Sequence, residues 1–347
     1  MRTLSLRGSH IYDSSEECTL RLVATWTAGK DLEVVGRLVK QMPLRADISV
    51  SQLVESMGKS GVLGAGNLGR ALRVTTEMFK DPDYAVFLTL AGPMVPGGLR
   101  KIIQTLIARG LVDGLVTTGA NLVHDIIEAL GHSGVQGTFT ADDVGLRAQN
   151  IGRAGDIFFP QEGFTALEKK IHQVLDTIPS SRLEGISVSE FLAEMGNSLD
   201  DKTSILSTLA AKQVPVFCPA ILDSMLGLHL WTYGQLHPLH IDPLRDMSRL
   251  ADMMYDSKRV GAIILGGGAS KHFLLGASTL RDGLDAAVQI TLDRPEGGSL
   301  SGAPLEEAIS WKKAKAKSRL ATIIGDATIV FPILMTASLQ ALEGQRR

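Results

Sequence analysis

The residues best suited to covalent catalysis lie between Ser299 and Lys317, in the stretch SLSGAPLEEAISWKKAKAK. A turn of small residues leads into a predicted helix, with Ser301–Ala303 as its cap. At helical spacing, Glu306, Ser310 and Lys313 share one face. A lysine beside carboxylates and a tryptophan, after a flexible Gly/Ser loop, is a candidate covalent nucleophile. The alternative is a solvated surface helix whose clustered lysines suit the negative end of the helix dipole.

The elements that must position these residues alternate between strands and helices from Asp83 onward. Strands are expected at residues 85–90, 114–116, 214–218, 261–265, 286–291 and 320–324, and helices at residues 99–107, 122–130, 165–178, 189–195 and 243–255. Strands separated by helices form a mainly parallel sheet with helices on both faces. The sequence therefore predicts an α/β fold with a doubly wound, Rossmann-like sheet.

Small and polar residues follow four of the predicted strands. The runs are Thr-Thr-Gly at 117–119, Pro-Ala-Ile-Leu-Asp at 219–223, Gly-Gly-Gly at 266–268 and Gly-Asp-Ala at 325–327. In parallel sheets, ligands bind beyond the carboxyl ends of the strands. Small residues allow close approach, exposed amides can meet a pyrophosphate, and Asp223 and Asp326 suit ribose hydroxyls. A tight turn explains any one run, but together the runs favour a nucleotide site.

The N-terminal part of the chain has a different texture. Residues 1–45 show no strong period and predict an irregular arm, followed by a single catalytic domain over residues 46–347. An amphipathic helix is expected at residues 48–57. The run GAGNLG at 64–69 matches GxGxxG, but it follows a helix and not a strand. A helix–turn–helix corner is therefore favoured over a dinucleotide loop.

Composition limits the class of protein. The chain has 347 residues, 44% hydrophobic and 21% charged, as expected of a soluble globular protein. A net charge of −2 and 5% aromatic residues give no field or stacking surface for nucleic acid or anionic lipid. Two cysteines, Cys18 and Cys218, argue for a reducing compartment, and the N-terminus lacks a signal-peptide core. We therefore expect a cytoplasmic protein.

Neither a metal site nor a membrane span is predicted. His229, His237 and His240 lie close in sequence but lack the spacing and carboxylate neighbours of a metal site. The apolar stretch 320–342 contains Asp326 and Pro332, so it is expected to be a buried strand and helix.

Several motifs resemble the deoxyhypusine synthase family. They are GAIILGGGASKHF, RDGLDAAVQIT, GGSLSGAPLEEAISWKK and GDATIVFP, preceded by LVTTGANLVHD, LRAQNIGRAGDIFFP and VPVFCPAILDSMLG. The resemblance covers roughly residues 48–335 in the same order, and the pairing of GGG-x-x-K-H with E-A-I-S-W-x-K is specific. The chain is identified from these motifs as a member of that family, which has homospermidine synthases as relatives.

The resemblance implies an NAD-dependent transfer of an aminobutyl group. In the family, spermidine is oxidised to an imine by hydride transfer to NAD, and an enzyme lysine captures the butylimine. The group then passes to a lysine of a translation initiation factor and is reduced. Homospermidine synthases pass it to putrescine instead. The resemblance also implies a homotetramer with its sites at subunit interfaces.

The family's site residues are carried over by position. Lys313 is then the imine-forming lysine, and His272 is a catalytic residue that contacts the donor amine. The remaining substrate-binding positions are Glu307, Trp311, Gly298 and Ser299. The NAD-binding positions are Thr117, Thr118, Gly119, Asp223, Gly267, Asp326 and Ala327.

Elementary chemistry agrees with these roles. A Schiff-base lysine must be neutral to attack, and burial beside other cations favours that form, whereas a nearby carboxylate opposes it. Lys312 and Lys315 are the flanking cations expected to supply this effect. Glu307 is suited to hold the substrate ammonium, and His272 to move a proton during amine oxidation. The ring of Trp311 offers a cationic amine an interaction worth ~0.5–2 kcal/mol.

Three positions depart from the family pattern. Val123, Leu228 and Leu300 stand where eukaryotic-type members have acids that pair with the ammonium groups of spermidine. A buried ammonium without its partner costs several kcal/mol. The donor is then shorter or differently charged at its far end, or it is held by Glu306, Glu307 or His124.

Two alternatives to protein modification stay open. One is transfer between small amines such as putrescine or agmatine, as in homospermidine synthases. The other is a catalytically silent nucleotide-binding paralogue, against which the retained Lys313 argues.

Overall fold

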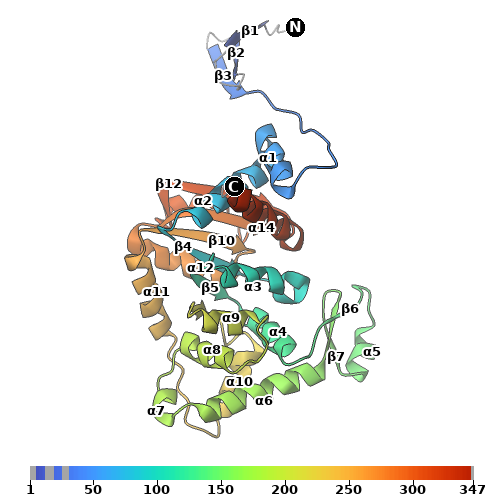
Figure 1. Ribbon diagram of the computed structural model, residues 1–347, viewed down its shortest axis with the longest axis vertical. Coiled ribbons are helices and arrows are strands. Elements are labelled where there is room, and N and C mark those ends of the chain that lie inside the picture. Colours follow the sequence, from blue (N-terminus) through green and yellow to red (C-terminus); the bar gives the residue numbers. More distant parts are fainter. Residues whose placement is uncertain (1–4, 12–18, 26–30, 345–347) are drawn as a thin grey trace.

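A sheet of six parallel strands lies at the centre of this computed structural model, which describes residues 5–11, 19–25 and 31–344 (Figure 1). Its strands are β4 (Tyr84–Leu90), β5 (Gly114–Thr117), β9 (Val216–Phe217), β10 (Arg259–Leu265), β11 (Leu284–Thr291) and β12 (Ala314–Ile324). The spatial order is β12-β11-β10-β4-β5-β9, and every pairing is parallel. Read along the chain, this is the 3-2-1-4-5-6 order of doubly wound dinucleotide-binding sheets. The predicted fold class is confirmed.

Helices cover both faces of the sheet, and further helices pack against these. They are α1 (Val50–Ser60), α2 (Leu63–Lys80), α3 (Arg100–Ala108), α4 (Gly119–Ala129), α6 (Gln161–Thr177), α7 (Ser180–Leu183), α8 (Val188–Asn197), α9 (Ile205–Ala211), α10 (Met225–Gly234), α11 (Leu244–Asp256), α12 (Gly268–Ser278), α13 (Glu307–Ser310) and α14 (Ala327–Gly344). Short turns η1 (Val95–Leu99), η2 (Thr279–Arg281) and η3 (Pro295–Gly297) lie between them. The predicted strands and helices are confirmed to within about four residues, except that β12 begins at Ala314, well before the strand expected at 320–324.

Alternate side chains of the central strand enter two separate cores. Leu88 of β4 belongs to a large cluster that includes Phe331 of α14. Its neighbour Phe87 belongs to a second cluster, which includes Leu250 of α11 and Leu274 of α12. Burial on both faces explains why these strands read as continuous apolar runs.

The GAGNLG run lies inside α2, and the predicted helix–turn–helix corner between α1 and α2 is confirmed. A Cβ atom on Gly69 would lie 2.1 Å from the Cα atom of Gly58 in α1. One on Gly66 would lie 2.5 Å from the backbone of Gly61. These glycines therefore serve the close packing of two helices and not a phosphate loop.

The arm predicted to be irregular contains three strands, so that part of the prediction was wrong. β1 (Ser5–Ile11), β2 (Thr19–Thr25) and β3 (Asp31–Arg37) form an antiparallel sheet, drawn away from the main body in Figure 1. The runs TLRLVAT and DLEVVGR are rich in β-branched residues, which favour strands. Cys18 lies outside the described residues, and the division into an arm and one domain stays a prediction.

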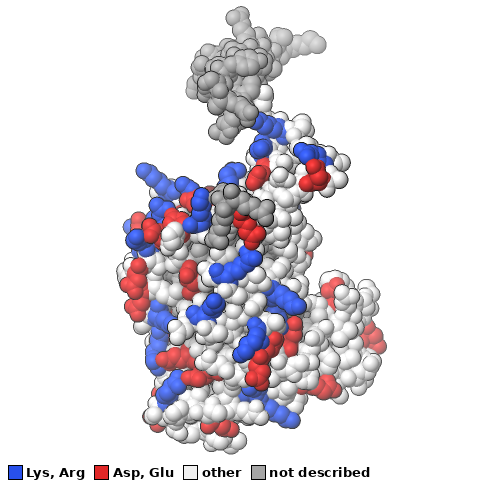
Figure 2. All heavy atoms as spheres, in the orientation of Figure 1, with Lys and Arg blue, Asp and Glu red and all other residues white. Residues whose placement is uncertain are grey.

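A second small sheet forms between α4 and α6. It joins β6 (Val135–Gln136), β8 (Ile157–Pro160) and β7 (Ile151–Ala154) in that order, with α5 (Asp143–Ala148) between β6 and β7 in the chain. Figure 2 shows acidic and basic side chains interspersed over the face it draws, as the small net charge suggests.

The C-terminal helix α14 is long and apolar enough, by length and composition, to cross a membrane. It packs against α1 and α2, with Phe331, Leu334 and Met335 in the core beside the sheet. This packing buries one face of the helix, and 33% of the helix is buried in all, so the expected buried strand and helix at 320–342 are found with the helix only partly buried.

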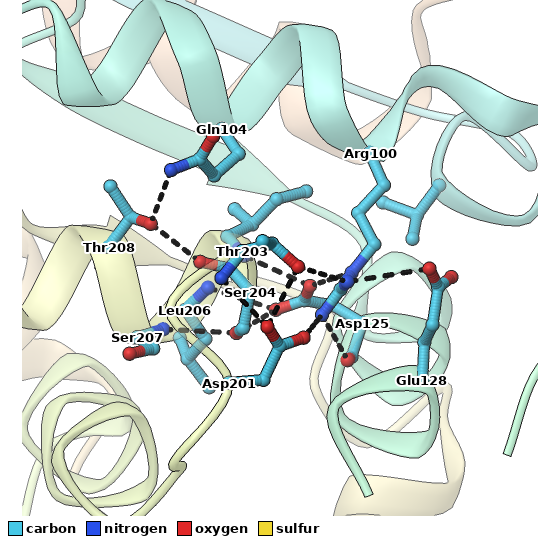
Figure 3. A network of polar contacts seen from close by, with 12 residues as sticks. Arg100, Gln104, Asp125, Glu128, Asp201, Thr203, Ser204, Leu206, Ser207 and Thr208 are labelled. Carbon is cyan, nitrogen blue, oxygen red and sulfur yellow. Dashed lines mark hydrogen bonds and ion pairs between the residues drawn. The ribbon is translucent and has the colours of Figure 1, made fainter. Parts of the chain in front are cut away.

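A buried ion-pair network stiffens the side of the sheet that carries β5 and α4 (Figure 3). Asp125 of α4 is fully buried and accepts hydrogen bonds from Arg100 Nε, Ser204 Oγ and the backbone N–H groups of residues 205 and 206. Arg100 also pairs with Asp201 at 2.8 Å. The network ties α3 and α4 to the segment that starts α9.

Candidate active site

The segment that carries the candidate nucleophile is not the helix predicted for it. The helix α13 ends at Ser310, and Lys312 has a left-handed φ of 55° that turns the chain into β12. Glu306 and Lys313 therefore do not share a helical face, and α13 has no side-chain cap. The lysine-rich run forms the start of β12 because it pairs with β11, which local propensity does not reveal.

The backbone of Lys313 is held firmly where it enters β12. Its N–H donates to the carbonyl oxygen of Ala308 at 2.9 Å. Its carbonyl oxygen accepts from Ser278 Oγ at 2.9 Å and from the N–H of Leu284 at 3.1 Å. Three neighbouring elements thus fix the point from which the side chain extends.

The lysine side chain lines a cavity of about 440 Å³. The cavity brings together all the predicted catalytic and substrate-binding positions: Lys313, His272, Glu307, Trp311, Gly298 and Ser299. Lys313 Nζ lies 5.5 Å from the centroid of the Trp311 ring, within range of a cation–π contact. An amine entering the cavity meets a carboxylate, an imidazole, an indole and a primary amine.

A second lysine lies in this cavity, and the sequence analysis missed its importance. Lys271 is 2% exposed, and Nζ donates to Gln289 Oε1 at 2.9 Å and to the carbonyl oxygens of Leu300 at 2.8 Å and Ala303 at 2.9 Å. Burial lowers its pKa to about 8, with Glu307 opposing the shift. Its place in the GGG-x-x-K-H motif was the only available signal.

The prediction that Lys312 and Lys315 are the cations beside Lys313 was wrong. Lys315 Nζ bonds to Asp285 Oδ1 at 2.6 Å, and Lys312 is exposed. The cation that lines the cavity with Lys313 is instead Lys271, and repulsion between these two ammonium groups contributes to lowering the pKa of Lys271. Because the three N–H bonds of Lys271 are all used, Lys313 is the lysine free to react.

A second cavity, of about 430 Å³, opens at the carboxyl edge of the sheet. Its lining includes the turns at residues 91–94, 266–268 and 325–328, which follow β4, β10 and β12. The strand order reverses between β4 and β10, so this cavity occupies the switch point where doubly wound sheets bind ligands. Of the predicted cofactor positions, Gly267, Asp326 and Ala327 line it.

This second cavity fits a dinucleotide. Its glycine turns expose backbone close to any ligand, and its volume lies within the usual range of small-molecule sites. Asp326 Oδ1 accepts from the N–H and Oγ1 of Thr328, both at 2.8 Å. Its Oδ2 accepts no hydrogen bond from the described residues, so it is available for a ribose hydroxyl.

The other predicted cofactor positions gather beside this cavity but do not line it. Thr117 is buried at the end of β5, and the N–H of Thr118 donates to the carbonyl oxygen of Leu90 at 3.3 Å. A Cβ atom on Gly119 would lie 2.3 Å from Ser224 Oγ. This close approach brings the Thr-Thr-Gly turn against the loop that carries the exposed Asp223.

The three departures from the family pattern lie in different surroundings. Leu300 lines the lysine cavity, Val123 is buried within α4, and Leu228 of α10 is 46% exposed. Among the described lining residues, Glu307 is the one carboxylate in the cavity. Across all the residues that the structure describes, no group of three or more His, Cys, Asp or Glu is placed to hold a metal ion.

The fold and the two cavities define a class of protein: a doubly wound α/β protein with a lysine-lined cavity beside a second cavity at the switch point of its sheet. A protein-family model described as deoxyhypusine synthase matches residues 52–338. The "Probable deoxyhypusine synthase" of Methanothermobacter thermautotrophicus is 45% identical over 304 residues, which cover 88% of this chain and 98% of that protein. That of Methanopyrus kandleri is 45% identical, covering 86% of this chain and 96% of that protein.

The chain therefore belongs to the deoxyhypusine synthase family, as the motifs predicted. A solved structure from Entamoeba histolytica, named as a candidate deoxyhypusine synthase, has a TM-score of 0.61 at 20% identity. The match covers 85% of this chain and 95% of the chain in that structure. At that identity the likeness concerns the fold alone.

Proposed function

We propose that this protein is an NAD-dependent deoxyhypusine synthase, which transfers an aminobutyl group from spermidine to a lysine of a translation initiation factor. The observation that carries the proposal is the pairing of two cavities along one loop. One cavity presents Lys313 with Glu307, Trp311 and His272. The other lies at the switch point of the sheet, and residues 299–303 contribute to both.

The chain's own residues account for each stage of the transfer. Glu307 and the Trp311 ring bind the ammonium end of the donor, and His272 accepts a proton as the donor amine is oxidised. The neutral amine of Lys313 then attacks the imine carbon and releases the rest of the donor, which leaves the butyl group on Lys313. The acceptor lysine displaces Lys313 in the same way.

NAD, when bound, supplies the hydride acceptor for the first oxidation and the hydride donor for the final reduction. Gly267, Asp326 and Ala327 would hold it within the crevice. The turn at 117–119 and Asp223 would extend the same site along the carboxyl edge of the sheet. These assignments draw support from the strand order and from Asp326 Oδ2, which is open to a ligand.

We extend the proposal to a cytoplasmic homotetramer whose subunits complete one another's sites. Trp311 is 65% exposed although it lines the lysine cavity, and Leu228 and Trp231 of α10 are also exposed. A second subunit over Trp311 would remove its apolar ring from water, and covering the exposed residues of α10 would stabilise the assembly in the same way.

Transfer to a small amine is the second candidate function. The cavity wall includes Leu275 and Leu300, and among its described lining Glu307 is the one carboxylate. A donor with one ammonium near Glu307, or with a differently charged far end, suits that wall better than a fully protonated triamine. Putrescine and agmatine are the donors or acceptors to compare with spermidine.

One trapping experiment tests both candidates. The protein is incubated with NAD and spermidine labelled in the butyl moiety, with and without the translation factor, and reduced with borohydride. Label on Lys313, followed by transfer to the factor, supports the synthase. Turnover of an amine panel without any protein acceptor supports small-amine transfer. Absence of label on Lys313 contradicts the synthase, and absence of turnover with every amine of the panel contradicts small-amine transfer.

A further inference from the structure

Two buried polar side chains between the cavities have no role in the chemistry described above. Lys271 is 2% exposed, and Gln289, near the carboxyl end of β11, is fully buried. Burying an ammonium and an amide in the protein interior is unfavourable unless both are hydrogen-bonded. Their partners therefore indicate why these residue types are present.

Every polar hydrogen of this pair is used. The three bonds of Lys271 Nζ reach Gln289 Oε1 and the carbonyl oxygens of Leu300 and Ala303. Gln289 Nε2 donates to the carbonyl oxygens of Gly266 at 3.0 Å and Ser301 at 2.8 Å. An ammonium offers three donors and an amide two, so the set is saturated. We call these five bonds the polar clamp.

The polar clamp grips one short segment, residues 299–303, which we call the dividing loop. Leu300 and Ala303 line the lysine cavity, whereas Ser301 lines the cavity at the switch point. Ser301 Oγ also accepts from the N–H of Gly268 at 3.1 Å. The dividing loop is therefore the shared wall that separates the amine from the cofactor.

The two halves of the polar clamp act on different sides of this wall. Lys271 holds Leu300 and Ala303, which face the amine. Gln289 holds Ser301 and Gly266, which face the cofactor. Neither half includes a carboxylate, so the grip is directional hydrogen bonding to backbone and not a nonspecific ion pair.

We propose that Lys271 and Gln289 are positioning residues that fix the dividing loop, Lys271 setting the wall of the amine cavity and Gln289 the wall of the cofactor crevice. The naming of the two sides rests on the proposed function, whereas the hold on the loop does not. A displacement of the wall by about 1 Å suffices to lower the rate of a transfer reaction a hundredfold.

The test compares Lys271→Met with Gln289→Glu. Lys271→Met removes all three bonds of the ammonium and leaves Gln289 able to hold Ser301. Gln289→Glu keeps an acceptor for Lys271 but removes both donors to the cofactor side. Arg100→Met is the matched control, because it breaks a buried ion-pair network remote from the dividing loop (Figure 3). Lys271→Gln replaces Lys271→Met if that variant does not fold.

Hydrogen exchange of the ligand-free protein gives the first readout. Peptides covering residues 298–304 should exchange at least about tenfold faster in both clamp variants than in Arg100→Met at equal loss of stability. Equal exchange in all three variants would overturn the proposal. This readout needs no substrate, so it stands even if the protein proves not to be a synthase.

Kinetics give the second readout. Lys271→Met should raise the amine KM about tenfold with less than about a threefold change in the Kd of NAD, and Gln289→Glu should do the reverse. Parallel changes in both constants for both variants would refute the division of labour. If exchange responds and no amine is turned over by the native chain, the proposed function fails while the hold on the loop stands.

Discussion

Replacement of Lys313 by arginine separates nucleophilic attack from every other property of the site. The backbone at this position is held by Ala308, Ser278 and Leu284, so the substitution leaves the strand entry in place. The guanidinium can still lie over the Trp311 ring and keep the positive charge. What changes is the supply of a neutral amine.

The size of the effect follows from the acidity of arginine. With a pKa of ~12.5 or higher, a guanidinium is neutral in fewer than about 1 in 10,000 molecules at pH 8. An ordinary primary amine with a pKa of ~10.4 is neutral in about 1 in 250 molecules at pH 8, so imine trapping should fall at least about 100-fold, while the Kd of NAD changes less than about twofold. The assay is borohydride trapping of labelled spermidine, with NAD binding measured by isothermal titration calorimetry.

The matched control is Lys312→Arg, because Lys312 is the neighbouring, exposed lysine that shapes the turn into β12. This variant should trap label as the native chain does. If Lys313→Arg still trapped label, the nucleophile would have to be another residue. Loss of NAD binding in Lys313→Arg would show that the two cavities are less independent than the structure indicates.

Three further outcomes are expected. Gly119→Ala places a Cβ atom 2.3 Å from Ser224 Oγ, so NAD affinity measured by titration should fall roughly tenfold, matching an overpacking cost of about 1–3 kcal/mol. Asp125→Ala leaves a buried guanidinium short of its main partner, and calorimetry should show loss of about 3–5 kcal/mol and a midpoint roughly 6 °C lower, with the Kd of NAD unchanged. The lowered pKa of Lys271, about 8 against 10.5, means that the unfolded chain binds more protons between these values. Between pH 8 and 10.5, the free energy of unfolding of the native chain should therefore rise by up to about 3 kcal/mol relative to that of Lys271→Met. A difference between the two proteins that does not change with pH would contradict this expectation.

The sheet was predictable because its strands carry their own signal. Ala85–Leu90 and Gly261–Leu265 are apolar runs bounded by glycine or proline, and each is buried on both faces. The strand order did not follow from those runs, since the pairing of β4 with both β5 and β10 is set by contacts far apart in sequence. The turn residues at the strand ends still indicated the correct edge of the sheet.

The local structure at the nucleophile could not be predicted for the same reason. The run at residues 314–319 has a strong helical composition, but its partner Leu284 draws it into β12, with a register shift before Ala286. The left-handed turn at Lys312 exists to redirect the chain between the two elements. Lys271 was overlooked because its bonds go to backbone carbonyl oxygens and to Gln289, none of which a local pattern reveals.

The arrangement of the two cavities bears on which amine the protein accepts. Lys313 is fixed through backbone bonds to α12, α13 and β11, so its reach is the same whatever the donor. The cavity wall also includes the dividing loop, where Leu300 offers no charge to a second ammonium. Leu300→Asp should therefore lower the KM for spermidine by about tenfold and raise that for shorter diamines, if a charged pair is worth about 1.4 kcal/mol at this half-buried position. Equal effects on all amines would place the length discrimination elsewhere in the cavity, and no effect would mean that the far end of the donor lies beyond Leu300, against a neighbouring subunit.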